Sequence, residues 1–478
     1  MANTPQLGAK VRALRRARSM TQAQLAQRLG ISASYLNLIE HGKRSVSAPL
    51  LIQLAGLFDL DLRSLSPEQH AREVADLLEV FGDPIFDAQD VTTGEVKDLA
   101  ATCPQAARAV LGLYRAYREA REATDTLTAR LSAGDLEGAD SQQLPTEEVS
   151  DLVQRQMNWF PDLEAGAEAL GQHLRQDGEE LGPALTRRLG AVGIQVRVAQ
   201  PAEMEGAMRR FDPATGTLWL SELLRSGTRH FQQAHVLGLL TQAHLLDRYA
   251  ADPHLTSEPA RRLARVALAN YFAGAVLMPY APFLEAARSE RYDIELLSHR
   301  FRVGFEQVCH RLTTLRRPGQ EGIPFHMVRV DVAGNISKRF SASGLRFARF
   351  SGACPRWTVF EAFTTPGLVR TQLSQMPDGI SYFWMARTVR MQEGGYRAPR
   401  SLQAIGLGCE LSHAADLVYA DGVDLAGRAA VVPVGITCRL CERMECEQRA
   451  FPPLQHPLTV NEHVRWLSFY SPPPSRPR

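Results

Sequence analysis

Long apolar runs, a strong net charge and a basic-then-apolar leader are all missing from this sequence of 478 residues. Its longest apolar stretch, residues 271–284, contains two prolines and is shorter than the roughly 20 residues that cross a bilayer. The N-terminus lacks the pattern of a secretory signal peptide. These absences argue against a membrane-spanning protein and predict a soluble cytoplasmic protein with no membrane partner.

Cysteines are few, and their number, seven, is odd. An even, regularly spaced set would be typical of a secreted disulfide framework, which this sequence does not have. Instead Cys438, Cys441 and Cys446 cluster within nine residues, with Cys409 upstream. In a reducing compartment such a cluster favours ligation of a metal or metal cluster over disulfide formation.

The small net charge of +2 conceals an uneven distribution along the chain. Residues 1–58 hold eight basic side chains and a single acid, Glu40, so this part carries +7 and the remainder carries −5. A basic module on a mildly acidic body is suited to attracting phosphate at one end only.

The length predicts several domains, because one core rarely grows beyond about 250–300 residues. Strand-like runs occur at 194–199 and 217–221, and from about residue 324 the composition turns β-branched and aromatic. The polar stretch at 132–146 has no apolar periodicity and is predicted to be a linker. We expect a mainly α N-terminal half, with a helix-turn-helix at 1–68 and a helical dimerisation or linker region at 69–145. An α+β peptidase-like domain at 146–318 and an α+β cysteine-bearing domain at 319–470 would follow.

The N-terminal module has the signals of a helix-turn-helix between residues 7 and 65. Thr21 is suited to cap a first helix, Gly30 to form the tight turn, and Ser32 to cap the second helix. The second helix would then lie in the major groove of DNA. The alternative is a small helical bundle that only holds proteins together, but it does not explain the basic charge.

Several residues of this module would face DNA because the apolar positions take up the inner side of both helices. They are Gln22, Ser32, Ala33, Ser34, Tyr35, Asn37, Lys43 and Arg44. The segments TQAQLAQRLGIS and YLNLIEHGKR resemble the Cro/repressor-type family. Two half-sites on an operator then imply a homodimer or a higher even oligomer.

The segment FQQAHVLGLL resembles the His-Glu-x-x-His helix of ImmA/IrrE-type zinc peptidases, with most of the chemistry lost. His235 matches the first histidine, but Val236 replaces the general-base glutamate and Leu239 the second histidine. Val266 stands where the downstream glutamate ligand is expected. A catalytic zinc needs three protein ligands and a base, so we predict no catalytic residues, a structural role for His235 and no enzyme activity.

The order of these segments resembles the RamB/PrpR-type regulators that respond to short-chain fatty acids or acyl-CoA. The resemblance covers nearly the whole chain, notably ANYFAGAVLMPY, RYDIELLSHRF and CRLCERMECEQRAFPP. It implies control of glyoxylate- or methylcitrate-type genes and binding of coenzyme A or an acyl-CoA. The basic and aromatic candidates for that ligand are Arg209, Arg210, Tyr280, Arg291, Tyr292, Arg311, Lys338 and Arg339, each of which can equally be a surface or structural residue.

The three clustered cysteines suit a tetrahedral zinc or a [4Fe–4S] cluster if a fourth ligand joins them. Cys409 is the candidate, although it can instead be a small core residue, and His413 is a weaker choice. The resemblance to PrpR-type members favours the iron–sulfur cluster over zinc. Thiols without any metal are the remaining alternative.

Together these patterns and the resemblance predict a DNA-binding transcription regulator of short-chain fatty-acid metabolism, gated by coenzyme A or an acyl-CoA, with an iron–sulfur cluster as a candidate second input. Two other functions stay open: a redox sensor without acyl-CoA input, and a regulator-fused metallopeptidase, which the missing ligands disfavour.

Overall fold

The computed structural model describes most of the chain, namely residues 8, 11–12, 15, 18, 20–41, 43–44, 46–58, 67–86, 91–133, 145–175, 178–345, 347, 353–390, 401–427, 430–439, 441–453, 463 and 470. The chain divides into two compact units. The N-terminal unit contains residues 1–141, 348–353 and 435–478, and the central unit contains 142–347 and 354–434. The cysteine cluster therefore groups with the N-terminal unit and not with the rest of the region 319–470.

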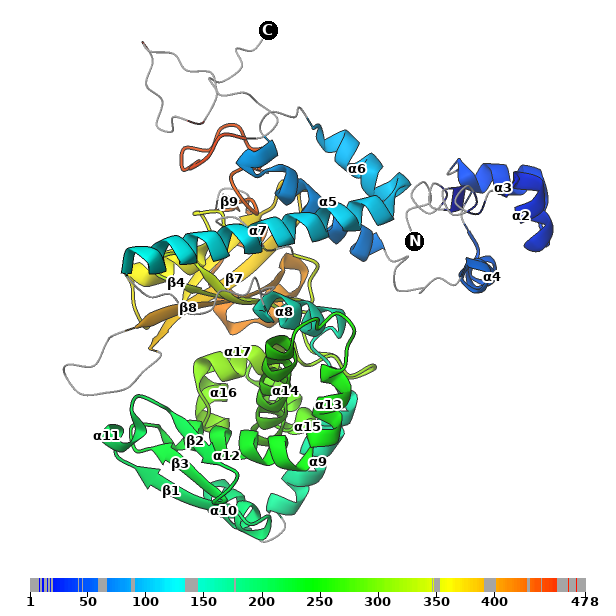
Figure 1. Ribbon diagram of the computed structural model, residues 1–478. Coiled ribbons are helices and arrows are strands. Elements are labelled where there is room, and N and C mark those ends of the chain that lie inside the picture. Colours follow the sequence, from blue (N-terminus) through cyan, green and yellow to red (C-terminus); the bar gives the residue numbers. More distant parts are fainter. Residues whose placement is uncertain are drawn as a thin grey trace. The chain divides into compact units, whose positions relative to one another are not determined.

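The N-terminal unit is helical and has two small cores among its described residues. The first core joins α2 (Gln22–Arg28), α3 (Ala33–Glu40) and α4 (Ala48–Phe58). The second joins α5 (Pro67–Phe81), α6 (Thr93–Thr102) and the long α7 (Pro104–Ala133), with the 3-10 turn η2 (Pro84–Phe86) between α5 and α6 (Figure 1). We call α5–α7 the helical segment. Most of the predicted linker, residues 134–144, lies outside the described residues.

The first part of the central unit is a helical layer with one small sheet. Its helices are α8 (Pro145–Arg155), α9 (Pro161–Arg175), α10 (Leu181–Ala191), α11 (Pro201–Met204), α12 (Ser226–Thr241), α13 (Ala243–Ala250), α14 (Glu258–Leu277), α15 (Tyr280–Ser289), α16 (Ile294–Phe301) and α17 (Phe305–Thr313). The sheet has the order β1-β3-β2, with β1 (Gln195–Ala199) parallel to β3 (Thr217–Ser221) and β2 (Arg209–Asp212) antiparallel to it. The runs predicted at 194–199 and 217–221 are thus confirmed as strands, whereas β2 has no clear signal in the sequence.

The second part of the central unit is a six-stranded sheet of order β5-β4-β8-β7-β6-β9. Its strands are β4 (His326–Asp331), β5 (Ile336–Ser341), β6 (Arg370–Gln375), β7 (Ser381–Arg390), β8 (Leu402–Glu410) and β9 (Val432–Pro433). The aromatic segment WTVFEAF is not a strand, since it forms α18 (Thr358–Glu361) and the 3-10 turn η3 (Ala362–Thr364). Two further 3-10 turns, η4 (Leu411–Asp416) and η5 (Val418–Ala420), follow β8. The α+β fold class is confirmed.

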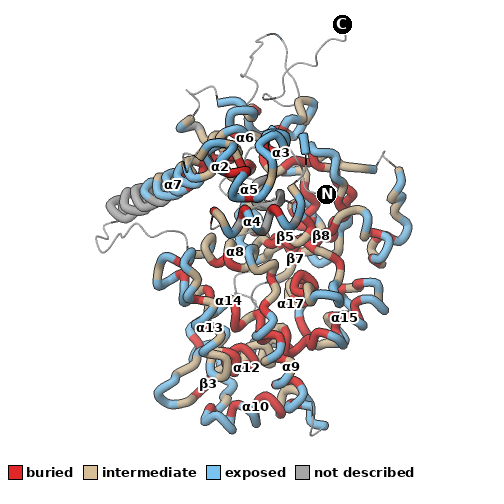
Figure 2. The backbone as a smooth tube through the Cα atoms, turned by 90° about the vertical axis from the view of Figure 1, so that its right-hand side faces the viewer, coloured by how far each residue is buried: buried red, intermediate tan, exposed pale blue. Residues whose placement is uncertain are grey.

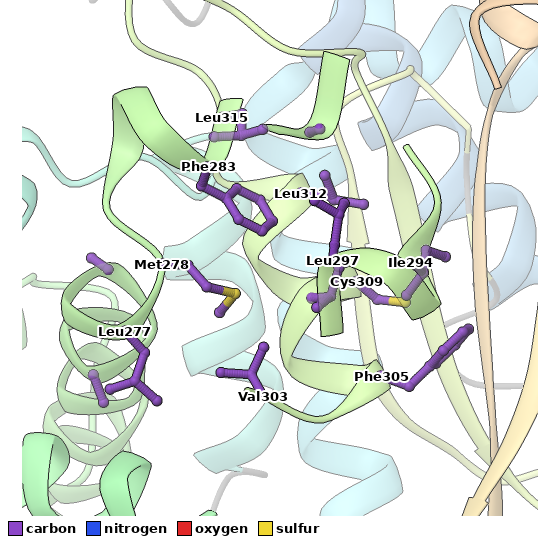
Figure 3. Close-up of a cluster of buried hydrophobic side chains, with 14 of the residues drawn as sticks. Leu277, Met278, Phe283, Ile294, Leu297, Val303, Phe305, Cys309, Leu312 and Leu315 are labelled. Carbon is purple, nitrogen blue, oxygen red and sulfur yellow. The ribbon is translucent and has the colours of Figure 1, made fainter. Parts of the chain in front are cut away.

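One continuous core unites the helical layer and the six-stranded sheet. It runs from α9 through α14–α17 to strands β4, β7 and β8, and α14 is among the most buried helices (Figure 2). Figure 3 shows the part of this core where Met278, Phe283, Val303 and Leu312 come together with Cys309. The predicted peptidase-like domain therefore forms one packed body with residues 319–347 and 354–434.

No single helix among the described residues is long and apolar enough to cross a membrane. By length and composition alone, α14 and α15 pass that test as a pair bent by 67°.

Candidate functional site

The helix-turn-helix is built by local hydrogen bonds that its sequence encodes. The Thr21 hydroxyl accepts a hydrogen bond from the Gln24 backbone N–H, and the Gln24 side-chain oxygen accepts one from the Thr21 N–H. These two bonds form a capping box at the start of α2. Ser32 caps α3 in the same way by accepting from the Tyr35 N–H. Gly30 lies at φ +64°, a conformation that favours glycine. The predicted caps and turn are therefore confirmed.

The residues predicted to contact DNA lie at the surface of this module. Those that are exposed are Ser32, Ala33, Ser34, Asn37, Lys43 and Arg44, and those that are half-buried are Gln22 and Tyr35. The Arg44 guanidinium lies 5.3 Å from the centre of the Tyr35 ring, so the residue predicted to contact phosphate and the ring predicted to face the groove are adjacent. This arrangement presents α3 with a basic flank, as a major-groove helix requires.

Glu40 organises the inner side of this surface, a role that the sequence analysis missed. Its carboxylate is fully buried and accepts two hydrogen bonds from Arg15, at 2.6 and 3.0 Å. It also accepts from the Gln22 side chain at 2.8 Å, and Gln22 in turn donates to Asn37 Oδ1 at 3.3 Å. The available signal was that Glu40 is the lone acid in a basic module.

The charge state of Glu40 follows from these partners. Burial alone raises its pKa, but the hydrogen bonds from Arg15 and Gln22 outweigh burial, and the net effect is a lowered pKa. Glu40 is thus ionised at neutral pH and fixes Gln22 beside Asn37.

The peptidase-like site keeps His235, the first histidine of the motif, as a buried side chain. Burial, with Arg209 adding to it, lowers the pKa of His235 to about 3, so the ring is neutral. Its Nδ1 lies 2.8 Å from Asn270 Oδ1 on α14. The residue of α14 that contacts His235 is thus Asn270. Val266, which the resemblance placed at the glutamate position, lies one helical turn earlier and is 39% exposed. Val236 is completely buried.

Four of the residues predicted to bind an acyl-CoA have structural partners inside the helical layer. Arg311 forms a bidentate, fully buried ion pair with Glu164, and it lies 5.6 Å from the Tyr280 ring centre. The Tyr280 hydroxyl donates to the Gln320 carbonyl. Arg209 donates to Gln232 on α12, and Arg210 stacks over Trp219.

The other four predicted effector residues join parts of the central unit. Arg291 bonds to Asp421 and to two carbonyls of the segment 415–417, while Tyr292 packs edge-on against Phe325. Lys338 pairs with Glu306, and Arg339 pairs with Glu147. Of the eight, Tyr280 and Arg311 come from separate helices and are in contact, and acyl-CoA binding by any of the eight stays a prediction.

A cavity of about 840 Å³ lies elsewhere in the central unit and includes none of those eight residues. Its wall is formed by the start of α12, by α16, by the start of α17 and by the adjoining ends of β7 and β8. The charged residues of the lining are three arginines and one acid: Arg225, Arg387, Arg390 and Glu295. Much of the remaining lining is apolar, for example Leu223, Val303 and Phe305.

Arg387 has two partners at the wall of the cavity. It donates to Glu295 at 2.7 Å and its guanidinium lies 5.1 Å from the Phe305 ring centre. Its Nε is buried and has no hydrogen-bond partner among the described residues. The side chain as a whole lines the cavity, and its cationic guanidinium suits an anionic or acceptor group of a ligand.

The predicted metal ligands are divided between the two units. Cys438, Cys441 and Cys446 lie in the N-terminal unit. Cys409 is buried near the end of β8, where burial raises the pKa of its thiol to about 12 and so disfavours a thiolate. Its position favours the alternative that Cys409 is a small core residue. Among the described residues, no three His, Cys, Asp or Glu side chains are already gathered as a metal site.

Comparisons with known proteins agree with this architecture. Residues 11–65 match the family described as helix-turn-helix, residues 189–313 the IrrE N-terminal-like domain, and residues 314–470 the short-chain fatty acyl coenzyme A regulator, C-terminal domain. The chain combines a helix-turn-helix whose helices are capped with a peptidase-like domain that lacks the metal-ligating residues of the motif. It is a helix-turn-helix transcription regulator.

The chain belongs, more specifically, to the RamB/PrpR family of transcriptional regulators. It is 41% identical to the regulator RamB of Mycobacterium tuberculosis (97% of this chain, 98% of RamB) and 42% identical to PrpR of the same species (96% and 94%). It is also 41% identical to the propionyl-CoA carboxylase regulator of Cereibacter sphaeroides (98% and 99%). A solved Mycobacterium tuberculosis transcriptional regulator matches with a TM-score of 0.65 and 44% identity, over 69% of this chain and 100% of its own.

Proposed function

We propose that this regulator senses a short-chain acyl-CoA in the 840 Å³ cavity of the central unit and controls genes of short-chain fatty-acid metabolism. The cavity is the observation that carries the proposal, because its size is typical of a small-molecule site and it combines an arginine-rich part with an apolar part. The family description of the C-terminal domain and the printed names of the relatives support the choice of effector.

The chemistry of the cavity matches the two ends of an acyl-CoA. Phosphates favour arginine because its planar guanidinium makes paired, charge-assisted hydrogen bonds. Three arginines against one glutamate leave the lining positive, while Leu223, Val303 and Phe305 offer an apolar wall to a short acyl chain. Ligand binding would shift the populations of the central unit and so alter DNA binding by a homodimer or higher even oligomer.

The ion pair between Arg387 and Glu295 allows a test in which substitutions of the two partners should change the affinity for acyl-CoA in opposite directions. Calorimetric titration of the full chain with coenzyme A, acetyl-CoA and propionyl-CoA measures the affinity directly. Arg387→Gln removes a cation and leaves Glu295 unpaired, so we expect affinity to fall about tenfold or more. Glu295→Gln frees Arg387 and should raise affinity. The exposed Arg261 provides a control, Arg261→Gln, which should change nothing.

Two results would contradict this assignment. Absence of binding by the wild-type chain would overturn the effector itself. Unchanged affinity in both cavity variants would overturn the location and leave the eight residues predicted from sequence as the next candidates.

We propose, second, that Cys438, Cys441 and Cys446 ligate a thiophilic metal group, with a [4Fe–4S] cluster favoured over zinc by the family resemblance. Two observations support a fit. Cys438 Sγ already accepts the Ala450 N–H at 3.4 Å, and a Cβ added at Gly435 would lie only 2.9 Å from Cys441 Sγ. Glycine thus leaves room for a sulfur ligand against the backbone.

Anaerobic purification followed by an absorption spectrum and iron and zinc analysis tests the metal. Iron and sulfide with visible thiolate-to-iron absorption are expected, and stoichiometric zinc without iron would exclude the cluster. Cys409→Ala should retain the metal, whereas Cys441→Ala should lose it.

A further inference from the structure

The segment 435–453, which we call the cysteine loop, is part of the N-terminal unit although more than 350 residues separate it from the helical segment that it contacts. Two arginines of the loop determine its structure and its attachment: Arg439, between Cys438 and Cys441, and Arg449, three residues after Cys446.

Arg449 holds the loop together from inside. Its side chain is 4% exposed, and its guanidinium donates to four backbone carbonyls: Cys438 O at 2.5 Å, Cys441 O at 2.8 Å, Arg443 O at 2.7 Å and Phe451 O at 3.5 Å. The fixed fork of a guanidinium suits several acceptors at once. The single nitrogen of a lysine has only three donors, and an apolar residue has none, so neither replaces the four bonds; the backbone on both sides of the CxxC turn depends on Arg449.

The positive charge of Arg449 also suits the chemistry of the loop. A buried cation next to Cys438 and Cys441 offsets the negative charge that two thiolate ligands would bring. The Ala450 N–H bond to Cys438 Sγ places a second positive dipole at the sulfur.

Arg439 attaches the loop to the helical segment. It lies between Cys438 and Cys441, and its Nη1 donates to the Gly82 carbonyl at 2.8 Å, directly after the end of α5. Its guanidinium also lies 5.7 Å from the Phe451 ring centre. A cation at a helix C-terminus interacts favourably with the carbonyls left without partners there.

We propose that the cysteine loop couples metal ligation by its thiols to the helical segment α5–α7, with Arg449 as the positioning residue and Arg439 as the link. Ligation draws Cys438 and Cys441 together, and Arg439 lies on the chain between them. The loaded loop therefore holds Arg439 against Gly82 and stabilises the end of α5, which shares its core with α6 and α7. This inference rests on thiolate ligation as proposed above and is independent of the acyl-CoA site.

Hydrogen exchange read by mass spectrometry on the full chain tests the coupling, with metal-stripped protein compared with protein reloaded with Zn²⁺ as the probe. We expect exchange in residues 67–86 to slow about tenfold on loading. Arg439→Gln should keep the metal content but lose that protection. Arg449→Met should weaken Zn²⁺ binding about 10- to 100-fold, and Arg261→Gln should behave as wild type.

The outcomes separate the two proposals. Failure of the wild-type chain to bind Zn²⁺ overturns ligation by the loop, on which the coupling rests. Stoichiometric Zn²⁺ with unchanged exchange at 67–86, or with equal protection in Arg439→Gln, overturns the coupling alone. Circular dichroism identifies any Arg449→Met protein that has lost its fold. In that case the coupling is tested by Arg439→Gln alone, since this substitution alters only a half-buried side chain.

Discussion

The ion pair between Glu164 and Arg311 should be among the most costly interactions to break in the central unit. Both side chains are at most 2% exposed, and two hydrogen bonds of 2.6 and 2.9 Å join them. The Tyr271 hydroxyl adds a third bond to Glu164, and Arg311 Nε donates to the Met278 carbonyl. The network links α9, α14 and α17.

Removing only one partner leaves an uncompensated charge in the core. Glu164→Ala should therefore reduce the free energy of unfolding by about 3–5 kcal/mol. For a body of this size that corresponds to a fall in Tm on the order of 6–15 °C. The double variant Glu164→Leu with Arg311→Met removes both charges and should lose much less than either single change.

Urea and thermal unfolding of the full chain, followed by tryptophan fluorescence, measure these differences. Glu258→Gln is a matched control, because Glu258 pairs with Arg262 on the exposed face of α14 and an exposed pair contributes at most about 0.5 kcal/mol. A loss below about 1 kcal/mol for Glu164→Ala, or a double variant no better than the single one, would refute the reasoning. The same experiment tests whether Arg311 is structural and not an acyl-CoA ligand.

Three further predictions concern the DNA-reading module and the peptidase-like site. On an operator selected from random duplexes, Asn37→Ala should weaken binding about 10- to 100-fold by fluorescence anisotropy, whereas Gln27→Ala, on an exposed position of α2, should not. Because the folded-state pKa of Glu40 is lowered, its stabilisation is present above the unfolded pKa of about 4.3 and is lost as pH falls through the folded value. Protection of residues 20–41 against hydrogen exchange should therefore fall at pH 4 relative to pH 7, and Glu40→Gln should abolish that difference. Finally, the chain with added Zn²⁺ should not cleave casein, and metal-dependent cleavage that disappears in His235→Ala would contradict our interpretation of the site.

The helix-turn-helix was predictable because its signals are local. The caps at Thr21 and Ser32 and the positive φ of Gly30 depend on residues within four positions of one another. The peptidase-like segment was readable for the same reason, since His235, Val236 and Leu239 share one helix. The contact between His235 and Asn270 of α14 was not predicted, because which face of a helix meets another depends on packing and not on spacing along the chain.

The predicted effector residues show what local signals could not predict. Residue type correctly singled out arginines and tyrosines as chemically able to bind coenzyme A, yet the eight chosen residues have structural partners across long sequence separations. The cavity collects Arg225, Glu295 and Arg387 from α12, α16 and β7, and no motif in the sequence joins them.

By itself the sequence determined the class of protein: a capped, basic helix-turn-helix, a peptidase-like body without its ligands, and a cluster of three cysteines. Only the tertiary structure decided which groups meet. It buried Cys409 in β8, grouped the cysteine loop with the helical segment through Arg439 and Gly82, and paired Arg311 with Glu164. The physical reason is that caps, turns and spacings are short-range, whereas burial and charge pairing are set by contacts between residues that lie far apart in the chain.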